Sequence, residues 1–297
     1  MVGFGDQVSV GIDIGASALR GVALRQRGGH FEVLAAAESI RTPNHPVPTL
    51  LDVERLIQAL QRQGFNPKSA VIAAPSDRLA NAIVELPPRS SGAPIDVLAG
   101  AELNKNVPGE LEVFVWDLPP GRHAKANEYL AIGFPHAAAN ELMSPFLQAG
   151  LTIEAIEPEM TALQRVTGAN GRLVLDAGMR GLRIYAYDGS NALFFRHIEL
   201  ANEAVDSDRV RTSVTGTIDY VADRFPTLEE ASVIVLGNPG QADRVSTMLK
   251  HEYDTSIVRD LRTELEFPEW LRDSGIGPRW EPAIGLAARP AAVGVAA

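Results

Sequence analysis

Short apolar runs alternate with polar turns and amphipathic stretches along most of this chain, a pattern typical of an α/β protein. The clearest instance is residues 8–25, where two apolar strands are joined at Gly15-Ala16-Ser17 and Asp13 lies just before the turn. The turn amides of such a hairpin can face an anion, and a nearby carboxylate can hold a hydrated Mg²⁺. We expect Gly15 to adopt a positive φ in this tight turn.

The chain contains this hairpin twice. Residues 174–187 align without gaps on residues 11–24. The alignment places four pairs in equivalent positions: Asp176 with Asp13, Gly178 with Gly15, Leu182 with Leu19, and Arg183 with Arg20. An internal repeat is a clue to the whole fold, and this one predicts two related lobes that face a cleft.

The rest of the pattern predicts the other elements of both lobes. Strands are predicted at 31–38, 71–74, 80–86, 129–133, 151–156, 192–199 and 232–236, and helices at 51–63, 96–106, 136–148, 160–166, 210–225 and 241–251. Thr49 to Asp52 predict a capping box for the first helix. Pro145 lies inside a helical pattern, so that helix either bends or has a separate first part. We expect the small, apolar tail 290–297 to be disordered.

Composition excludes several classes of protein. A chain of 297 residues can form one large or two ordinary domains, and without cysteine it has neither disulfides nor thiolate metal sites. No apolar run approaches the roughly 20 residues of a membrane span, and residues 1–7 lack a signal-peptide pattern, so we expect a cytoplasmic protein. The net charge of −10 argues against binding to nucleic acid or to an anionic membrane surface.

Common catalytic motifs are also missing. The sequence has no P-loop, no Gly-X-Gly-X-X-Gly dinucleotide fingerprint and no Gly-X-Ser-X-Gly nucleophile elbow. Its six histidines do not have the spacing of metal ligands. These observations exclude the common hydrolase and oxidoreductase classes.

Four stretches, taken in order, resemble the PilM family of type IV pilus assembly, within the actin-like ATPase superfamily. They are residues 11–17 (GIDIGAS), 148–163 (QAGLTIEAIEPEMTAL), 173–178 (LVLDAG) and 283–289 (AIGLAAR). The cytoplasmic domains of GspL in type II secretion and the division protein FtsA are relatives of this family. The resemblance implies an α/β fold of two actin-like lobes (a duplicated ribonuclease H-like fold), with lobes at 1–166 and 167–289. It also implies a PilM/FtsA-type subdomain inserted at about 70–155.

The same resemblance carries expectations about function. It implies an ATP-binding cleft between the lobes, and a groove between the sheet of the first lobe and the insertion that receives a short peptide of a PilN-like or GspL/GspM-like inner-membrane protein. The expected role is a cytoplasmic scaffold beneath an inner-membrane platform, peripheral to the membrane through that partner and next to motor ATPases.

This chain departs from the family pattern in the segments expected to surround the nucleotide. Only about ten residues separate Leu200 from Val210, too few for the helical lid that the family carries there. The second hairpin, residues 176–181, lacks the usual threonine or serine, and the third glycine motif is Gly237-Asn238-Pro239-Gly240, in which Pro239 has no N–H to offer a phosphate. Phosphoryl transfer needs an enclosed, well-positioned site. We therefore expect weak or lost ATP binding and no turnover.

The residues expected around a retained nucleotide come from both hairpins and from the third glycine motif. They are Asp13, Gly15, Ala16, Ser17, Arg20, Asp176, Gly178, Met179, Gly237 and Asn238, with Asp13 and Asp176 as ligands of Mg²⁺ through water. In the alternative interpretation, the two glycines serve turns and the aspartates cap them. Arg20 and Arg183 alternate outward on their strands, which favours a surface role for Arg183. Glu157 and Glu159 precede a helix, where carboxylates stabilise the helix dipole.

The sequence leaves a different class of function open. An active actin-fold ATPase or a small-molecule kinase would bind Mg-ATP between the lobes, with Asp13 and Asp176 holding the metal, and would close on its substrate. A filament-forming actin relative is a third alternative. The missing lid and the absence of a clear catalytic base favour the scaffold.

Overall fold

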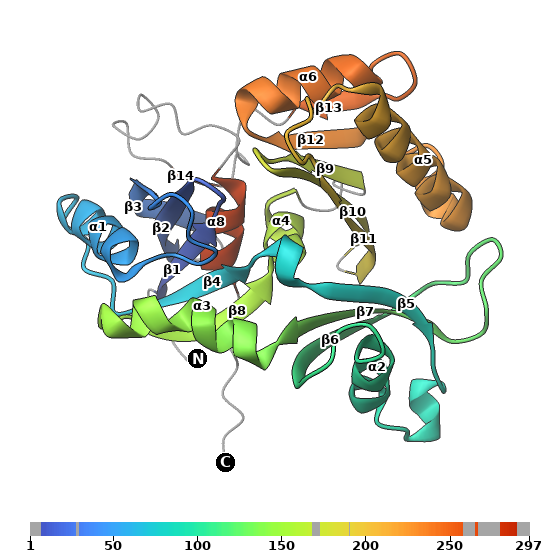
Figure 1. The fold of residues 1–297 in the computed structure, drawn as a ribbon, viewed down its shortest axis with the longest axis horizontal. Helices are drawn as coiled ribbons and strands as arrows, with labels where there is room; N and C mark the ends of the chain where they lie inside the picture. The colour runs from blue at the N-terminus through green and yellow to red at the C-terminus, as the bar shows by residue number, and fades with distance from the viewer. Residues whose placement is uncertain are drawn as a thin grey trace.

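The first lobe of the protein, seen in a computed structural model, is built on a six-stranded sheet (Figure 1). The structure describes residues 7–27, 30–167, 173–189, 191–257, 265–266 and 280–289. The strand order is β14-β3-β2-β1-β4-β8. The strands are β1 (Gln7–Ile14), β2 (Ala18–Arg27), β3 (His30–Ile40), β4 (Ser69–Ala74), β8 (Thr152–Pro158) and β14 (Leu265–Glu266).

The second lobe repeats this topology in a five-stranded sheet of order β11-β10-β9-β12-β13. In each lobe three consecutive antiparallel strands are followed by a parallel strand that pairs with the first of them: β4 with β1, and β12 with β9. The strands are β9 (Leu173–Ala177), β10 (Gly181–Asp188), β11 (Asn191–Glu199), β12 (Val233–Gly237) and β13 (Thr255–Ile257). The two-lobe duplication predicted from the hairpins is therefore present in the fold.

A separate three-stranded sheet of order β5-β7-β6 extends from the first lobe. It comprises β5 (Ala80–Glu85), β6 (Leu111–Asp117) and β7 (Glu128–Pro135), with α2 (Ile95–Leu103) packed on it. The insertion was expected at about 70–155, but the strands β4 and β8 at the two ends of this range belong to the six-stranded sheet. The separate sheet therefore spans only residues 80–135. The strand β6 was not predicted, because its residues 113–116 are consecutive apolar residues, each half-buried, with no alternation to indicate a strand.

The predicted helices form close to their expected positions, and the described residues contain one further helix, α8, that was not predicted. They are α1 (Leu50–Gln61), α3 (His136–Gln148), α4 (Glu159–Thr167), α5 (Asp208–Arg224), α6 (Pro239–Leu249) and α8 (Glu281–Ala287), with short 3₁₀ turns η1 (Ser76–Arg78), η2 (Arg89–Ser91) and η4 (Pro226–Leu228). The capping box of α1 is present, with Thr49 as N-cap and Asp52 as its partner. The helix α3 continues through Pro145 in its last turn as one helix.

Near the expected nucleotide site, the missing lid is confirmed, whereas the predicted start of the α6 helix is corrected. Residues 200–207, which connect β11 to α5, contain no helix or strand, as expected for a connection too short to form the lid of the family. The helix α6 begins at Pro239, earlier than predicted, because proline is suited to the first helical position, where an N–H has no intrahelical partner. The tail 290–297 lies outside the described residues.

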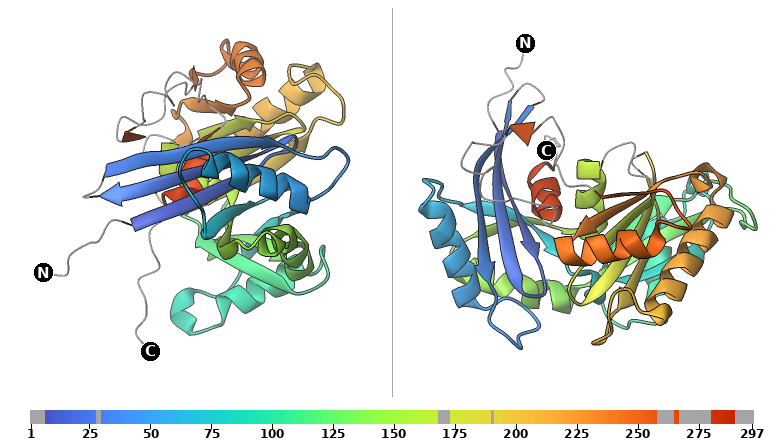
Figure 2. Two further views of the ribbon diagram at one scale, coloured as in Figure 1. Left: turned by 90° about the vertical axis from the view of Figure 1, so that its left-hand side faces the viewer. Right: turned by 90° about the horizontal axis from the view of Figure 1, so that it is seen from above.

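The helix α8, the red helix of Figure 2, belongs to the first lobe by its contacts. It packs on β1 and β2 of the first lobe and crosses α4. A Cβ atom at Gly11 of β1 would lie 2.1 Å from the Ala283 carbonyl oxygen, and one at Gly285 would lie 2.0 Å from the Ala162 carbonyl oxygen. Backbone therefore meets backbone on both sides of α8, a closeness that only glycine permits.

The buried core is continuous across the lobes. One cluster joins residues of the insertion (Leu130, Ile132), of α4 (Met160, Leu163) and of the second lobe (Val174, Tyr185, Ile234), together with neighbours from β10 to β12. The insertion thus packs against the second lobe as well as the first. Among the described residues, no helix combines the length and apolar character needed to cross a bilayer.

Candidate functional site

The two repeated hairpins place the same side chains in the same register. Asp13 lies directly across from Arg20 in the β1–β2 pair, and Asp176 lies across from Arg183 in the β9–β10 pair. At each turn the glycine N–H donates to a carbonyl oxygen 3.0 Å away, from Gly15 to Ala18 and from Gly178 to Gly181. The alignment made on sequence alone is therefore also a structural equivalence.

The expected positive φ at Gly15 is wrong, and Gly178 does not adopt one either. Both glycines instead lie in tight contact with their surroundings. A Cβ atom at Gly15 would lie 3.2 Å from the Arg20 guanidinium and 3.0 Å from the Ala18 oxygen, and one at Gly178 would lie 3.0 Å from the Arg183 guanidinium. Each glycine therefore leaves room for the arginine of its own hairpin.

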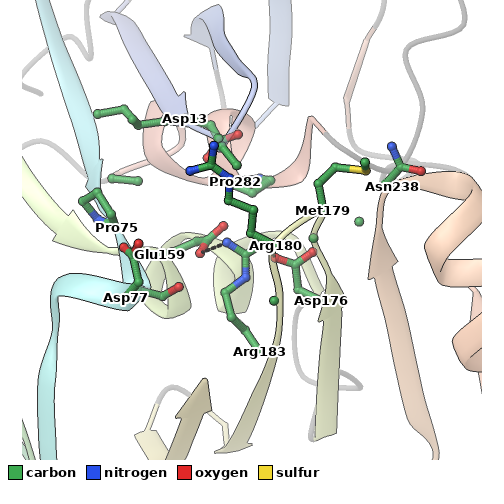
Figure 3. Close-up of a pocket in the computed structure, with 18 of the residues that line it drawn as sticks. Asp13, Pro75, Asp77, Glu159, Asp176, Met179, Arg180, Arg183, Asn238 and Pro282 are labelled. Carbon is green, nitrogen blue, oxygen red and sulfur yellow. Dashed lines mark hydrogen bonds and ion pairs between the residues drawn. The ribbon is translucent and has the colours of Figure 1, made fainter. Parts of the chain in front are cut away.

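A cleft of about 340 Å³ lies where the hairpins converge, and Figure 3 shows its lining. All ten residues expected around a nucleotide line it: Asp13, Gly15, Ala16, Ser17, Arg20, Asp176, Gly178, Met179, Gly237 and Asn238. The structure thus brings together residues that are more than 200 positions apart in sequence. Their role in binding stays a prediction.

Other lining residues did not stand out as site residues in the sequence. They include several charged or polar side chains: Arg41, Ser76, Asp77, Glu159, Arg180, His197 and Glu281. Arg41 donates to the Gly15 carbonyl oxygen at 2.9 Å and so supports the first turn. Glu159 carries a signal in the sequence, because it directly follows a strand pattern and opens a predicted helix.

Arg183 is not a surface charge, contrary to the sequence-based expectation. Its Nη1 donates to the Glu159 carboxylate at 2.9 Å, and its Nη2 pairs with Asp176. Figure 3 shows this guanidinium between the two carboxylates. As the alternation indicates, the Arg183 side chain points away from its own sheet. It does not reach solvent there, because that face of the sheet lines the cleft.

Glu159 also departs from its expected role at a helix terminus. Besides Arg183, it accepts a hydrogen bond from the Tyr185 hydroxyl at 3.2 Å and is 4% exposed. Burial raises the pKa of Glu159 to about 8, although Arg183 opposes the shift. Glu157, by contrast, pairs with Arg165 at 2.8 Å and Arg289 at 2.7 Å.

The remaining carboxyl groups of the cleft are buried as well. Burial raises the pKa of Asp13, with the positive charges of Arg20 and Arg183 opposing it, and burial raises the pKa of Glu281 well above its usual value. Among the described residues, neither carboxyl oxygen of Glu281 has a hydrogen-bond partner, so its surroundings favour the neutral form of this group. Burial, reinforced by Arg183, lowers the pKa of His197, whose Nδ1 lies 3.3 Å from the Ser76 hydroxyl.

Mg-ATP, which the fold implies, is a poor match for this cleft. Asp13 pairs with Arg20 at 3.2 Å and Asp176 pairs with Arg183, so both expected metal ligands already have cationic partners. Within the described part of the chain, no group of three or more acidic or histidine side chains is arranged to hold a metal. At the third turn, Asn238 accepts the Gly240 N–H through its own side chain at 3.2 Å. We therefore derive no catalytic step through a metal or a nucleotide.

Comparison with solved structures identifies the fold. The chain is similar to PilM in a PilM-PilN type IV pilus biogenesis complex, with a TM-score of 0.69 and 16% identity over 94% of this chain and 97% of that one. It is similar to the ethanolamine utilization protein EutJ of Carboxydothermus hydrogenoformans, with a TM-score of 0.52 and 14% identity over 95% and 89% of the chains. The cytoplasmic domain of EpsL, an inner-membrane component of the type II secretion system of Vibrio cholerae, matches with a TM-score of 0.51 and 10% identity over 88% and 90%.

These likenesses confirm the predicted actin-like ATPase fold and its similarity to PilM. No protein-family model matches the sequence, and no curated protein matches it. At such identities the structures establish the fold alone.

Proposed function

We propose that this protein is a cytoplasmic scaffold of a type IV pilus or type II secretion assembly platform, peripheral to the inner membrane through a partner. The observation that carries the proposal is the similarity to PilM over nearly the full length of both chains, since that PilM belongs to a complex with PilN. The similarity to the EpsL cytoplasmic domain supports the same setting. The proposed partner is a PilN-like or GspL/GspM-like inner-membrane protein, with a motor ATPase as a further neighbour.

The state of the cleft supports a scaffold in preference to an enzyme. No lid element lies between β11 and α5, and the acidic groups expected to bind metal are paired with arginine. A site that does not exclude water loses much of the electrostatic stabilisation on which phosphoryl transfer depends. Binding of Mg-ATP is therefore weak or lost. Calorimetric titration tests this, and tight binding that disappears in Asp13→Ala would favour an active ATPase or kinase.

The partner groove is proposed to lie between the six-stranded sheet and the insertion. Two exposed apolar side chains occur on the units that flank it: Leu147 of α3, 55% exposed, and Val97 of α2, 68% exposed. Exposed apolar side chains of this kind are candidates for contact with a peptide. Tyr220 of α5, 48% exposed, lies on the second lobe and provides a matched control.

The experiment is a fluorescence anisotropy titration. The probe is a labelled synthetic peptide with the cytosolic amino-terminal sequence of the single-span membrane protein encoded beside this chain, and a scrambled peptide is the reference. We expect saturable binding that Leu147→Glu or Val97→Glu weakens by about tenfold, equivalent to losing about 1.4 kcal/mol, while Tyr220→Glu leaves it unchanged. No binding by the folded wild type would contradict the scaffold proposal.

A further inference from the structure

The guanidinium of Arg183 lies among the carboxylates of the cleft. It joins Asp176 of β9 to Glu159 of α4, with a 2.9 Å contact to Glu159, and both partner side chains are 5% exposed. Burial by itself would lower the pKa of Arg183, but Asp176, Glu159 and the more distant Asp13 raise it above its ordinary value. Arg183 therefore carries a permanent positive charge at the meeting point of the lobes.

Buried acidic groups surround this charge, and those of them that are ionised need a cation. Asp13, Glu159, Asp176 and Glu281 are all buried, with exposed fractions of 6%, 4%, 4% and 1%. Several carboxyl groups removed from water are strongly destabilising unless they are protonated or paired with a positive charge. Proteins meet this need with a divalent metal or with arginine, whose flat guanidinium can bridge two carboxylates.

Each of the two repeated hairpins contains an arginine that lies across from an aspartate. Arg20 and Arg183 occupy equivalent places in the two hairpins, and each faces the aspartate of its own hairpin across the strand pair. Arg20 also pairs with Glu38 at 2.8 Å at the cleft edge, whereas Arg183 pairs with Glu159 inside. Each lobe thus supplies its own cation to its own carboxylate.

We propose that Arg183 takes the place of a divalent cation in this cleft, so that the cleft is charge-balanced and stable without metal. The proposal concerns the cleft alone and does not depend on the partner peptide. It predicts that the wild-type protein has no divalent-metal site here, and that removing the guanidinium leaves Asp176 and Glu159, the two carboxylates that it bridges, to take up a hydrated divalent cation in its place.

The test compares Arg183→Met with Arg183→Lys, the matched control that keeps the positive charge. Each is titrated with MnCl₂, and bound ion is measured by electron paramagnetic resonance. We expect no Mn²⁺ uptake by wild type or Arg183→Lys, and uptake by Arg183→Met that is abolished by adding Asp176→Asn. A folded Arg183→Met protein that takes up no Mn²⁺ at millimolar concentration would overturn the proposal.

A second measurement decides the matter if Arg183→Met does not fold. The melting temperature of the wild-type protein is compared in MgCl₂ and in EDTA, alongside Asp176→Asn. Equal melting temperatures for the wild type support the proposal. A wild-type stabilisation by Mg²⁺ that Asp176→Asn loses would show a metal at the position assigned to Arg183, and would contradict it.

Discussion

Arg224, at the end of α5 in the second lobe, forms an ion pair with Glu128 of β7 in the insertion, although 96 positions separate the two residues. Arg224 also donates to the Arg122 carbonyl oxygen at 3.1 Å, and the Arg122 N–H donates back to the Arg224 carbonyl at 3.2 Å. Gly121 allows this contact, because a Cβ atom there would lie 2.1 Å from the Arg224 oxygen. These contacts attach the insertion, through its loop 118–127 and Glu128, to α5 of the second lobe.

We expect Arg224→Met to loosen this attachment. The Arg224 and Glu128 side chains are 7% and 14% exposed, and breaking a buried pair leaves an unpaired charge, which costs about 3–5 kcal/mol. Hydrogen exchange of the amides in residues 118–127 should become faster, and the free energy of unfolding in urea should fall by about that amount.

The control for this variant is Arg122→Ala. The Arg122 side chain is 49% exposed and pairs with the exposed Asp223 and Glu229, so its removal should cost less than about 1 kcal/mol. If Arg224→Met changes neither the exchange nor the stability more than Arg122→Ala, the attachment is not held by this pair.

The capping box of α1 predicts a second stability effect. Asp52 is fully buried and accepts hydrogen bonds from the Thr42 N–H at 2.8 Å, the Thr42 hydroxyl at 2.7 Å and the Thr49 N–H at 2.9 Å. Asp52→Asn keeps the shape but turns an amide NH₂ toward these donors, so we expect a loss of about 1–3 kcal/mol in urea unfolding. Glu54→Gln, an exposed neighbour on the same helix, should be neutral.

The same carboxylate predicts a dependence on acid pH. Burial would raise the pKa of Asp52, but the hydrogen bonds from Thr49 and Thr42 outweigh it and lower the pKa below its usual value. The stabilisation is therefore present above the unfolded-state pKa of about 3.9 and is lost as the pH falls through the lower folded-state value. The stability difference between wild type and Asp52→Asn should shrink on acidification through that range; a constant difference would argue against a charged Asp52.

Glu159 predicts a pH dependence of stability opposite to that of Asp52, with stability falling as the pH rises. Its pKa is raised to about 8 from an ordinary value of 4.5, so the folded protein holds a proton that the unfolded chain has released. The contribution of Glu159 to stability is complete below pH 4.5 and declines as the pH rises towards 8. Relative to Glu159→Gln, the wild type should lose on the order of 1–4 kcal/mol over this range.

Urea unfolding of the two proteins at a series of pH values measures this difference. The Gln variant cannot titrate at this position, so it removes the background contributed by other groups. A difference that does not vary with pH between 4.5 and 8 would show that Glu159 is ionised throughout, with Arg183 compensating for its burial.

The glycine contact of α8 predicts a contrast between two helical positions. Gly285→Ala would place a Cβ atom 2.0 Å from the Ala162 carbonyl oxygen, which forces α8 away from α4. We expect a loss of about 1–3 kcal/mol or more, as for overpacked sites. Gly216→Ala in α5 meets nothing within 4 Å and should stabilise the protein by about 0.5–1 kcal/mol.

Thermal unfolding of both variants checks this contrast. Equal melting temperatures for Gly285→Ala and wild type would mean that α8 can shift without cost and does not pack tightly on α4.

The sequence by itself determined the local structure and the duplication. The sequence could predict the two hairpins, because a hairpin is a local structure defined by its own apolar alternation and its glycine turn. In the structure, Asp13 lies across from Arg20, and Asp176 lies across from Arg183. The capping box of α1 could be predicted for the same reason, since it involves only residues 49–52. The convergence of eight of the ten expected cleft residues was predicted from two repeats that face each other, and Gly237 and Asn238 were expected from the third glycine motif of the family.

Only the tertiary structure decided what the charged side chains do. Alternation along a strand shows that Arg183 points away from its own sheet, but whether that direction is solvent or the opposing lobe depends on packing across the cleft. The burial of Glu281 and the pairing of Arg224 with Glu128 likewise join segments far apart in the chain. Sequence patterns report short-range periodicity, whereas the charge of a buried group depends on which distant elements exclude water from it.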